Sequence, residues 1–333
     1  LHKLSKEVLV DYPSDSYFNY IFSYSLYYSQ HHKKVKVWYS EEEVWAKILK
    51  HLKLSKPLDK LHSGFCRRVQ RELYERASTQ LKLDDFEGAK EHLDFLLSFF
   101  DNSSKSYKNH YAGKIQDELF ESGKELFLSG NTDQADEVFD WMFDTFFQSP
   151  FEYKYDGAAG YQNEGYLFEE YRNPKYCLAN TARDIDYLSV KEKEVIYLQN
   201  LARMNPPLFR ETFLKKHLEI HPYRNNSTYV KSLIETLEKG ESQKPFYPDK
   251  RLFEAAEFHA IDMGETGMTG HTSSDGSSFG TRLRQFGTWS GIAENCSYAV
   301  SEPLAIILQL LIDDGVPSLG HRRTMLNSSY SYV

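Results

Sequence analysis

Two histidines and a glutamate lie in short polar segments late in this chain, and their side-chain types could do chemistry. His271 and His321 each follow a glycine, and Glu294 precedes Asn295. Segments rich in glycine, serine and asparagine lie on loops or at element ends, where polar side chains can converge. Two imidazoles and a carboxylate can bind a divalent metal or transfer protons. These residues are the first candidates for a functional site.

The spacing of the two histidines does not fit a local metal motif. His271 and His321 lie much further apart than the ligands of an HExxH or zinc-finger site, so only the fold could bring them together. Asp313 and Asp314 offer a further carboxylate, although residues of this type after an apolar segment also end helices. A capping or hydrogen-bonded structural role stays the alternative for each candidate.

The support for His259 and for the cysteines is weaker. His259 falls on the apolar stripe of its expected helix, which is typical of a buried structural histidine. Cys296 has no base near it in sequence, and the chain has no Gly-x-Ser-x-Gly motif, so nucleophilic catalysis has little support. Cys66, Cys177 and Cys296 form no CxxC pair, and we expect three free thiols.

Composition excludes some classes of function. A formal net charge of −8 argues against an extended phosphate-binding surface, and hence against nucleic acid as a partner. No apolar run approaches the roughly twenty residues of a membrane-spanning helix. The length of 333 residues suggests two domains, or three small ones.

Helices predicted in the second half of the chain must position the candidate residues. Ser189 and Glu192 form a capping box, which predicts a helix that ends near Met204, before Pro206. Asp249 is a plausible cap for a second helix, which is expected near residues 250–264. Further helices are expected near residues 229–237, 303–312 and 321–326.

The first half of the chain carries a helical pattern that repeats between about residues 65 and 148. Two sets of four residues match at equal offsets: Ala77, Asp84, Ala89 and Leu93 with Gly123, Gly130, Ala135 and Phe139. Small residues on both sides of a turn let two antiparallel helices approach closely. This pattern resembles the helix–turn–helix unit of tetratricopeptide repeats. An ordinary helical bundle with a chance match is the alternative.

The segments around these repeats are less regular. The aromatic-rich start of the chain is interpreted as helical, with a capping box at Ser40 and Glu43. Turn signals and tyrosines in the segment after the repeats predict a linker or a packed aromatic loop region. The expected organisation is a helical domain over 1–148, this linker over 149–182 and a second domain over 183–333.

Six segments of the second half, each weak alone, follow one another in a recognisable order. They cover residues 194–206, 252–263, 270–278, 282–283, 293–295 and 320–327. Together they resemble the CAP superfamily of cysteine-rich secretory, antigen 5 and pathogenesis-related-1 proteins. The closest likeness is to its bacterial SCP-like extracellular branch.

This resemblance implies an α+β fold for residues 183–333, after an all-α, tetratricopeptide-like domain. The expected architecture is a three-layer α-β-α sandwich around a largely antiparallel sheet, cut short at its last strands. It also implies a cleft lined by two histidines and two acidic residues. His271, Glu294 and His321 match three of those positions, and Asp313 or Asp314 is the nearest substitute for the fourth.

The resemblance further implies a secreted or cell-envelope protein of binding type. His271 and His321 would ligate a divalent ion such as zinc, with Glu294 and water completing or supporting the site. A lipid or small ligand in the cleft, and a protein or peptide on the helical region, are the implied partners.

Two other functions stay open at this point. The first alternative is a metal-assisted, peptidase-like hydrolase in which Glu294 acts as general base. In the second, the helical half is a functional scaffold and the C-terminal domain is a passive cap.

Overall fold

The computed structural model describes residues 46–48, 50, 63–98, 105–159, 161 and 167–333. The chain divides into two compact units, one ending at Glu118 and the other running from Leu119 to Val333. The capping box predicted at Ser40 and Glu43 lies outside the described residues, as does the aromatic segment before it.

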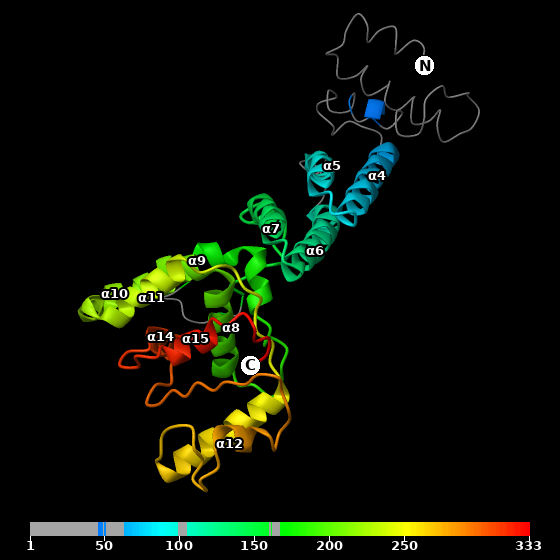
Figure 1. Cartoon of the computed structure of the whole chain (residues 1–333). Helices are drawn as coiled ribbons and strands as arrows, with labels where there is room; N and C mark the ends of the chain where they lie inside the picture. Colours follow the sequence, from blue (N-terminus) through cyan, green and yellow to red (C-terminus); the bar gives the residue numbers. More distant parts are fainter. Residues whose placement is uncertain (1–45, 49, 51–62, 99–104, 160, 162–166) are drawn as a thin grey trace, which may run out of the picture. The chain divides into compact units, whose positions relative to one another are not determined.

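Four helices follow one another in the first half of the described chain (Figure 1). They are α4 Ser63–Leu81, α5 Phe86–Ser98, α6 Lys105–Ser129 and α7 Thr132–Phe146. The turn after α4 contains Asp84 at φ 56°, and the turn after α6 contains Gly130 at φ 101°. The two turn residues that the repeat alignment pairs therefore both adopt left-handed backbone.

The matched small residues lie where helices approach. Ala77, Ala89 and Ala135 are fully buried, at 0% exposure. At Gly123 in α6, an added Cβ would lie 2.8 Å from Cζ of Phe139 in α7, so only glycine fits without displacing that ring. The predicted helix–turn–helix arrangement is thus confirmed, while kinship with tetratricopeptide repeats and a protein or peptide partner stay predictions.

The segment after α7 is packed onto that helix in its described part. It contains two 3₁₀ helices, η3 Glu169–Arg172 and η4 Pro174–Ala179. Lys175 Nζ lies 2.6 Å from Asp136 Oδ1, and the Asn173 amide donates to Asp140 at 2.8 Å. Tyr153 adds an edge-on contact with Phe147, with ring centroids 5.4 Å apart. Ion pairing and aromatic contacts together fix this segment against α7.

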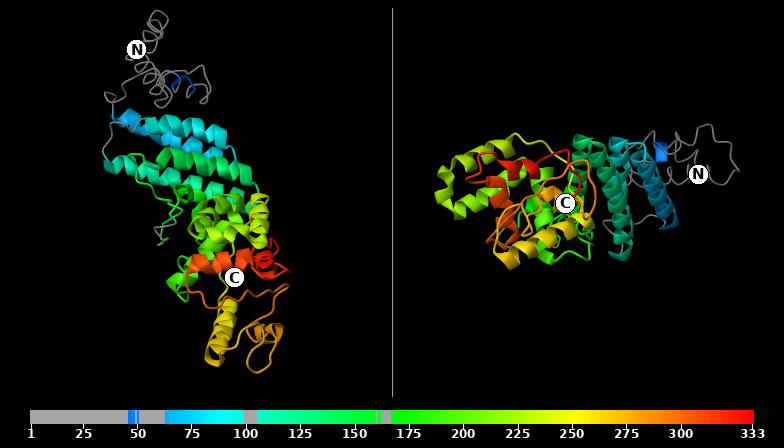
Figure 2. Two further views of the ribbon diagram at one scale, coloured as in Figure 1. Left: turned by 90° about the vertical axis from the view of Figure 1, so that its left-hand side faces the viewer. Right: turned by 60° about the horizontal axis from the view of Figure 1, so that its bottom comes forward.

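The remaining elements surround the candidate residues. They are α8 Val190–Met204, α9 Pro206–Phe209, the π-helical turn η5 Arg210–Leu214, α10 Lys215–Ile220, η6 Pro222–Asn226, α11 Thr228–Glu238, α12 Lys250–Thr266, α13 Phe279–Leu283, α14 Pro303–Ile312 and α15 Gly320–Met325. Helix α14 packs against α8, α11 and α15. Figures 1 and 2 show these helices side by side, with α12 at one edge of the unit.

Two predicted helix starts are confirmed by their caps. Ser189 Oγ accepts a hydrogen bond from the backbone of Glu192 at 3.3 Å, and the Glu192 carboxylate accepts from Ser189 N at 2.7 Å. Asp249 Oδ1 accepts from the backbone N–H groups of Arg251 and Leu252, which caps α12. These side chains satisfy N–H groups that a helix leaves without intrahelical partners.

The predicted three-layer sandwich is wrong for the described residues. Their backbone contains helices and loops, and strand pairing there is limited to one isolated parallel bridge between Tyr247 and Tyr332. Within the same described part, residues 288–301 make no backbone–backbone hydrogen bond. A strand is stable only beside a neighbour that completes its ladder, so this extended segment remains a loop along the helices.

The buried side chain of Arg203 binds backbone carbonyls in the domain for which a sheet was expected. Its Nη1 donates to Met325 O at 2.8 Å and to Asn327 O at 3.0 Å, and Nε donates to Lys244 O at 3.2 Å. The guanidinium also lies 3.7 Å from the ring centroid of Phe246. Burial lowers the pKa of Arg203 to about 10. These bonds attach the segment after α15 to α8.

Arg322 plays the same part between α11 and α14. Its Nε donates to Leu311 O at 2.7 Å, and its Nη2 donates to Tyr229 O and Ile312 O at 2.9 Å each. Nη1 reaches Ser232 Oγ at 2.8 Å. Burial lowers the pKa of Arg322, and the nearby Asp313 carboxylate opposes that shift.

Candidate functional site

His271 and Glu294 meet at the surface of the second unit. His271 lies in the loop between α12 and α13, and Glu294 lies on the extended segment before α14. Nδ1 of His271 is 2.9 Å from Oε1 of Glu294. The imidazole is 51% exposed, whereas the carboxylate is only 14% exposed. A carboxylate oxygen accepts hydrogen bonds, so the His271 proton lies on Nδ1 in this arrangement.

The buried side chain of Arg282 holds this pair in place. It lies in α13 at 1% exposure, and its Nη2 donates to Glu294 Oε2. Its Nη1 donates to the backbone oxygen of His271 at 3.2 Å and to Ser273 Oγ at 3.1 Å. One buried guanidinium thus holds both the loop of His271 and the carboxylate of Glu294.

His321 forms a second imidazole–carboxylate pair with Asp313. Asp313 ends α14 in left-handed backbone, at φ 59°. Its Oδ1 is 2.6 Å from His321 Nδ1, and its Oδ2 accepts from the backbone N–H of His321 at 3.0 Å and of Arg322 at 3.3 Å. Asp314 is exposed, so of the two predicted aspartates it is Asp313 that contacts the histidine.

The two pairs are linked through Asn295. Its side-chain Nδ2 donates to the backbone oxygen of His321 at 3.2 Å, and it directly follows Glu294. Both imidazoles direct Nδ1 to a carboxylate, which leaves Nε2 as the nitrogen that holds a lone pair. The structure therefore brings His271 to Glu294 and His321 to Asp313, with one asparagine between the pairs.

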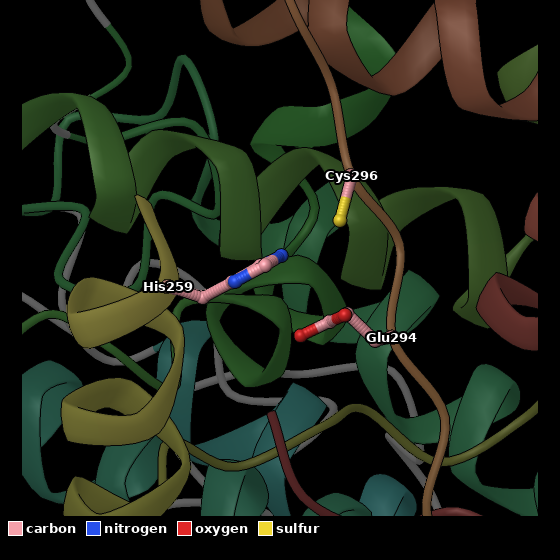
Figure 3. A group of neighbouring side chains, drawn as sticks. All are labelled: His259, Glu294 and Cys296. Atoms are coloured by element: carbon pink, nitrogen blue, oxygen red, sulfur yellow. The ribbon is translucent and has the colours of Figure 1, made fainter. Parts of the chain in front are cut away.

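A third group combines Glu294 with His259 and Cys296 (Figure 3). Ligand atoms of His259, Glu294 and Cys296 all lie within 4.8 Å of one another. His259 belongs to α12 and is 4% exposed. His259 was interpreted as a buried structural histidine and Cys296 as a free thiol without a nearby base, so this grouping was missed from sequence. The available signal was the spacing of Glu294 and Cys296, because residues two apart on an extended segment point to the same side.

The backbone carbonyl of Gly270 is the hydrogen-bond acceptor that the side chains around this group share. His259 Nε2 lies 2.9 Å from it, Tyr298 OH donates at 3.0 Å, and Cys296 Sγ lies 3.7 Å away. A carbonyl only accepts, so the proton of His259 is on Nε2. Burial, and then the charge of Glu294, raise the pKa of the Cys296 thiol. The thiol is therefore protonated in this state.

The cysteine and histidine do not form a nucleophile–base pair. Cys296 Sγ lies 3.6 Å from Nδ1 of His271, which is the same nitrogen that Glu294 contacts. In a catalytic triad the nucleophile and the orienting carboxylate use opposite ring nitrogens. Together with the raised pKa of the thiol, this geometry gives no support to covalent catalysis by Cys296.

Comparison with known families covers this part of the chain. Residues 197–333 match the family model described as CAP, cysteine-rich secretory protein family. These residues belong to the CAP family. The match begins within α8 and includes every candidate residue described above. The searches of curated proteins and of solved structures found no match.

The family assignment confirms the resemblance inferred from the six ordered segments. Affiliation with the bacterial SCP-like branch stays a prediction. Across the described residues, no helix combines the length and the apolar character that crossing a bilayer requires.

Proposed function

We propose that the CAP domain is a binding module that takes up a divalent metal, zinc, through Nε2 of His271 and of His321. The observation that supports it is that Nδ1 of each ring contacts a carboxylate, which leaves Nε2 for the metal. Nδ1 lies 2.9 Å from Glu294 in one case and 2.6 Å from Asp313 in the other. Metal-ligating histidines commonly donate their other ring N–H to a carboxylate, which fixes the tautomer and strengthens the ligand.

Each carboxylate has a separate part in this proposal. Asp313 is held by the backbone N–H groups of His321 and Arg322, and Glu294 is held by Arg282. Both are therefore positioned before any ion arrives, and they orient the imidazoles without moving. Imidazole suits zinc, and water would complete the coordination.

The alternative of a metal-assisted hydrolase has less support. A general base needs a carboxylate oxygen within hydrogen-bond reach of the attacking water. Glu294 contacts Nδ1 of His271, on the other side of the ring from Nε2, so it orients that ring and lies away from a water on a metal bound at Nε2. A small polar ligand bound at the metal fits the same geometry without requiring proton abstraction.

Isothermal titration of the metal-stripped chain with zinc tests the proposal. With Cys296 replaced by serine, so that its thiol cannot contribute to binding, we expect one-site binding that falls at least about tenfold for His271→Ala or His321→Ala, and that disappears in the double variant. His92→Ala, in α5, is the matched control and should bind zinc like the wild type. Unchanged zinc affinity in the double variant would contradict the proposal.

A further inference from the structure

The cluster of His259, Glu294 and Cys296 has a different composition from the two histidine–carboxylate pairs. We propose that it is a second metal position, which binds a zinc-like transition ion through a cysteine thiolate. This position goes beyond the proposed function because it uses neither His271 nor His321 as a ligand. Only Glu294 contributes to both.

The three side chains converge from elements that are far apart in sequence. His259 comes from α12, and Glu294 and Cys296 come from the extended segment before α14, with the imidazole pointing toward the space between the other two (Figure 3). Their ligand atoms lie within 4.8 Å of one another. Zinc in tetrahedral coordination holds its ligand atoms about 3.3–3.8 Å apart. Small side-chain rotations close that difference.

His259 carries an independent sign of a ligand. The residue is 4% exposed, its Nε2 lies 2.9 Å from Gly270 O, and its buried Nδ1 has no hydrogen-bond partner among the described residues. A buried polar atom without a partner costs roughly 1–3 kcal/mol. The ion would bind Nε2, the ring nitrogen nearer to Glu294 and Cys296 in Figure 3, in place of the Gly270 carbonyl, and the ring proton would then be on Nδ1.

The charges around Glu294 allow an ion here. Each carboxylate oxygen has two acceptor positions, so the contacts with Arg282 and His271 leave room for a metal bond. The thiol of Cys296 would release its proton to solvent when its sulfur binds the ion. Thiolate and carboxylate then supply two negative charges, set against the two positive charges of the metal and the one of Arg282.

The donor set selects the class of ion. A thiolate, an imidazole and a carboxylate suit Zn²⁺ or Co²⁺, whereas Mg²⁺ and Ca²⁺ prefer oxygen ligands only. The side chains are buried or half-buried, which limits the number of waters that could join them. We therefore expect discrimination in favour of zinc and cobalt over magnesium and calcium.

Cobalt titration of the full chain tests the thiolate directly. The background is the Cys66→Ser/Cys177→Ser chain, in which Cys296 is the only remaining thiol. We expect a thiolate-to-cobalt charge-transfer band in the near ultraviolet, which zinc displaces and magnesium does not. Cys296→Ser should abolish the band, and His259→Asn should weaken cobalt affinity at least about tenfold.

The His271→Ala/His321→Ala variant separates this position from the proposed function. It should keep the charge-transfer band, although it loses the exposed imidazoles. No band in the background chain, or a band that survives Cys296→Ser, would overturn the inference while leaving the zinc titration of the exposed pair unaffected.

A second readout covers the case in which His259→Asn fails to fold. Stoichiometric zinc should slow alkylation of Cys296 in the background chain at least about tenfold, and magnesium should not. Equal alkylation rates with both ions would also refute the second metal position.

Discussion

The helical hairpins and the CAP domain are stabilised by different contacts. In the hairpins, small apolar residues such as Gly123 and Ala135 let neighbouring helices approach, and the partners are near in sequence. In the CAP domain, buried guanidinium groups of Arg203 and Arg322 bind carbonyls from distant segments. The comparison shows that a domain without a sheet in its described part can satisfy its loop carbonyls through arginine side chains instead.

Substitution of Arg322 should break the CAP side of this comparison. We expect Arg322→Met to lower the free energy of unfolding by about 3–5 kcal/mol, because several buried carbonyls lose a charged donor at once. Urea unfolding, together with hydrogen exchange of α11 and α14, measures the effect. Arg323→Met, at the exposed neighbouring position, should stay within about 0.5 kcal/mol of the wild type. Similar losses in both variants would show that the backbone contacts of Arg322 are not what stabilises the domain.

A larger side chain at Gly123 should destabilise the helical hairpin of α6 and α7. Gly123→Val places a branched side chain against the ring of Phe139 and should cost about 2 kcal/mol, seen as faster hydrogen exchange in α6 and α7. Gly113 is also in α6, but no atom lies within 4 Å of an added Cβ there. Gly113→Val should therefore change stability by less than about 0.5 kcal/mol. If both valine variants behave alike, close helix approach at Gly123 is not what matters.

Acid should lower the stability of the CAP domain by a smaller amount, through protonation of His217. Burial, then His221 and Arg224, lower the pKa of His217 from 6.5 to about 4. The unfolded chain therefore binds the proton more tightly, so stability is full above about pH 6.5 and falls as pH drops towards 4. The loss should be about 1–2 kcal/mol after allowance for partial exposure.

Urea unfolding between pH 7 and pH 4 checks this dependence. His217→Asn should flatten the profile over that range, whereas His92→Asn in α5 should leave it unchanged. An equally steep profile in His217→Asn would assign the acid sensitivity to other groups.

Sequence patterns predicted the local structure well. The repeat alignment paired Asp84 with Gly130, and both adopt left-handed backbone in the structure; the caps at Ser189 and Asp249 begin the expected helices. Each of these features depends on residues within one or two turns of the chain. Such features can be inferred from one sequence because the interacting groups are neighbours in it.

The sheet and part of the candidate site could not be predicted in the same way. An extended segment becomes a strand only through a partner elsewhere, and residues 288–301 find none within the described residues. Likewise, His259 lies on an apolar stripe and shows its contact with Gly270 only in three dimensions. The choice between Asp313 and Asp314 depends on the left-handed turn at Asp313, which sequence alone does not specify.

The contacts of Arg203 also bear on how the chain folds during synthesis. Three of the carbonyls that it binds, those of Met325, Asn327 and Tyr330, belong to residues 122 to 127 positions further along the chain. A ribosome adds about 5–20 residues each second, so α8 emerges many seconds before its arginine can find these partners. Throughout that interval the guanidinium remains hydrated and the helix lacks its final packing. The N-terminal hairpins, built from local contacts, can form well before then, so a nascent chain with folded hairpins and an unfinished CAP domain is the species that chaperones would meet.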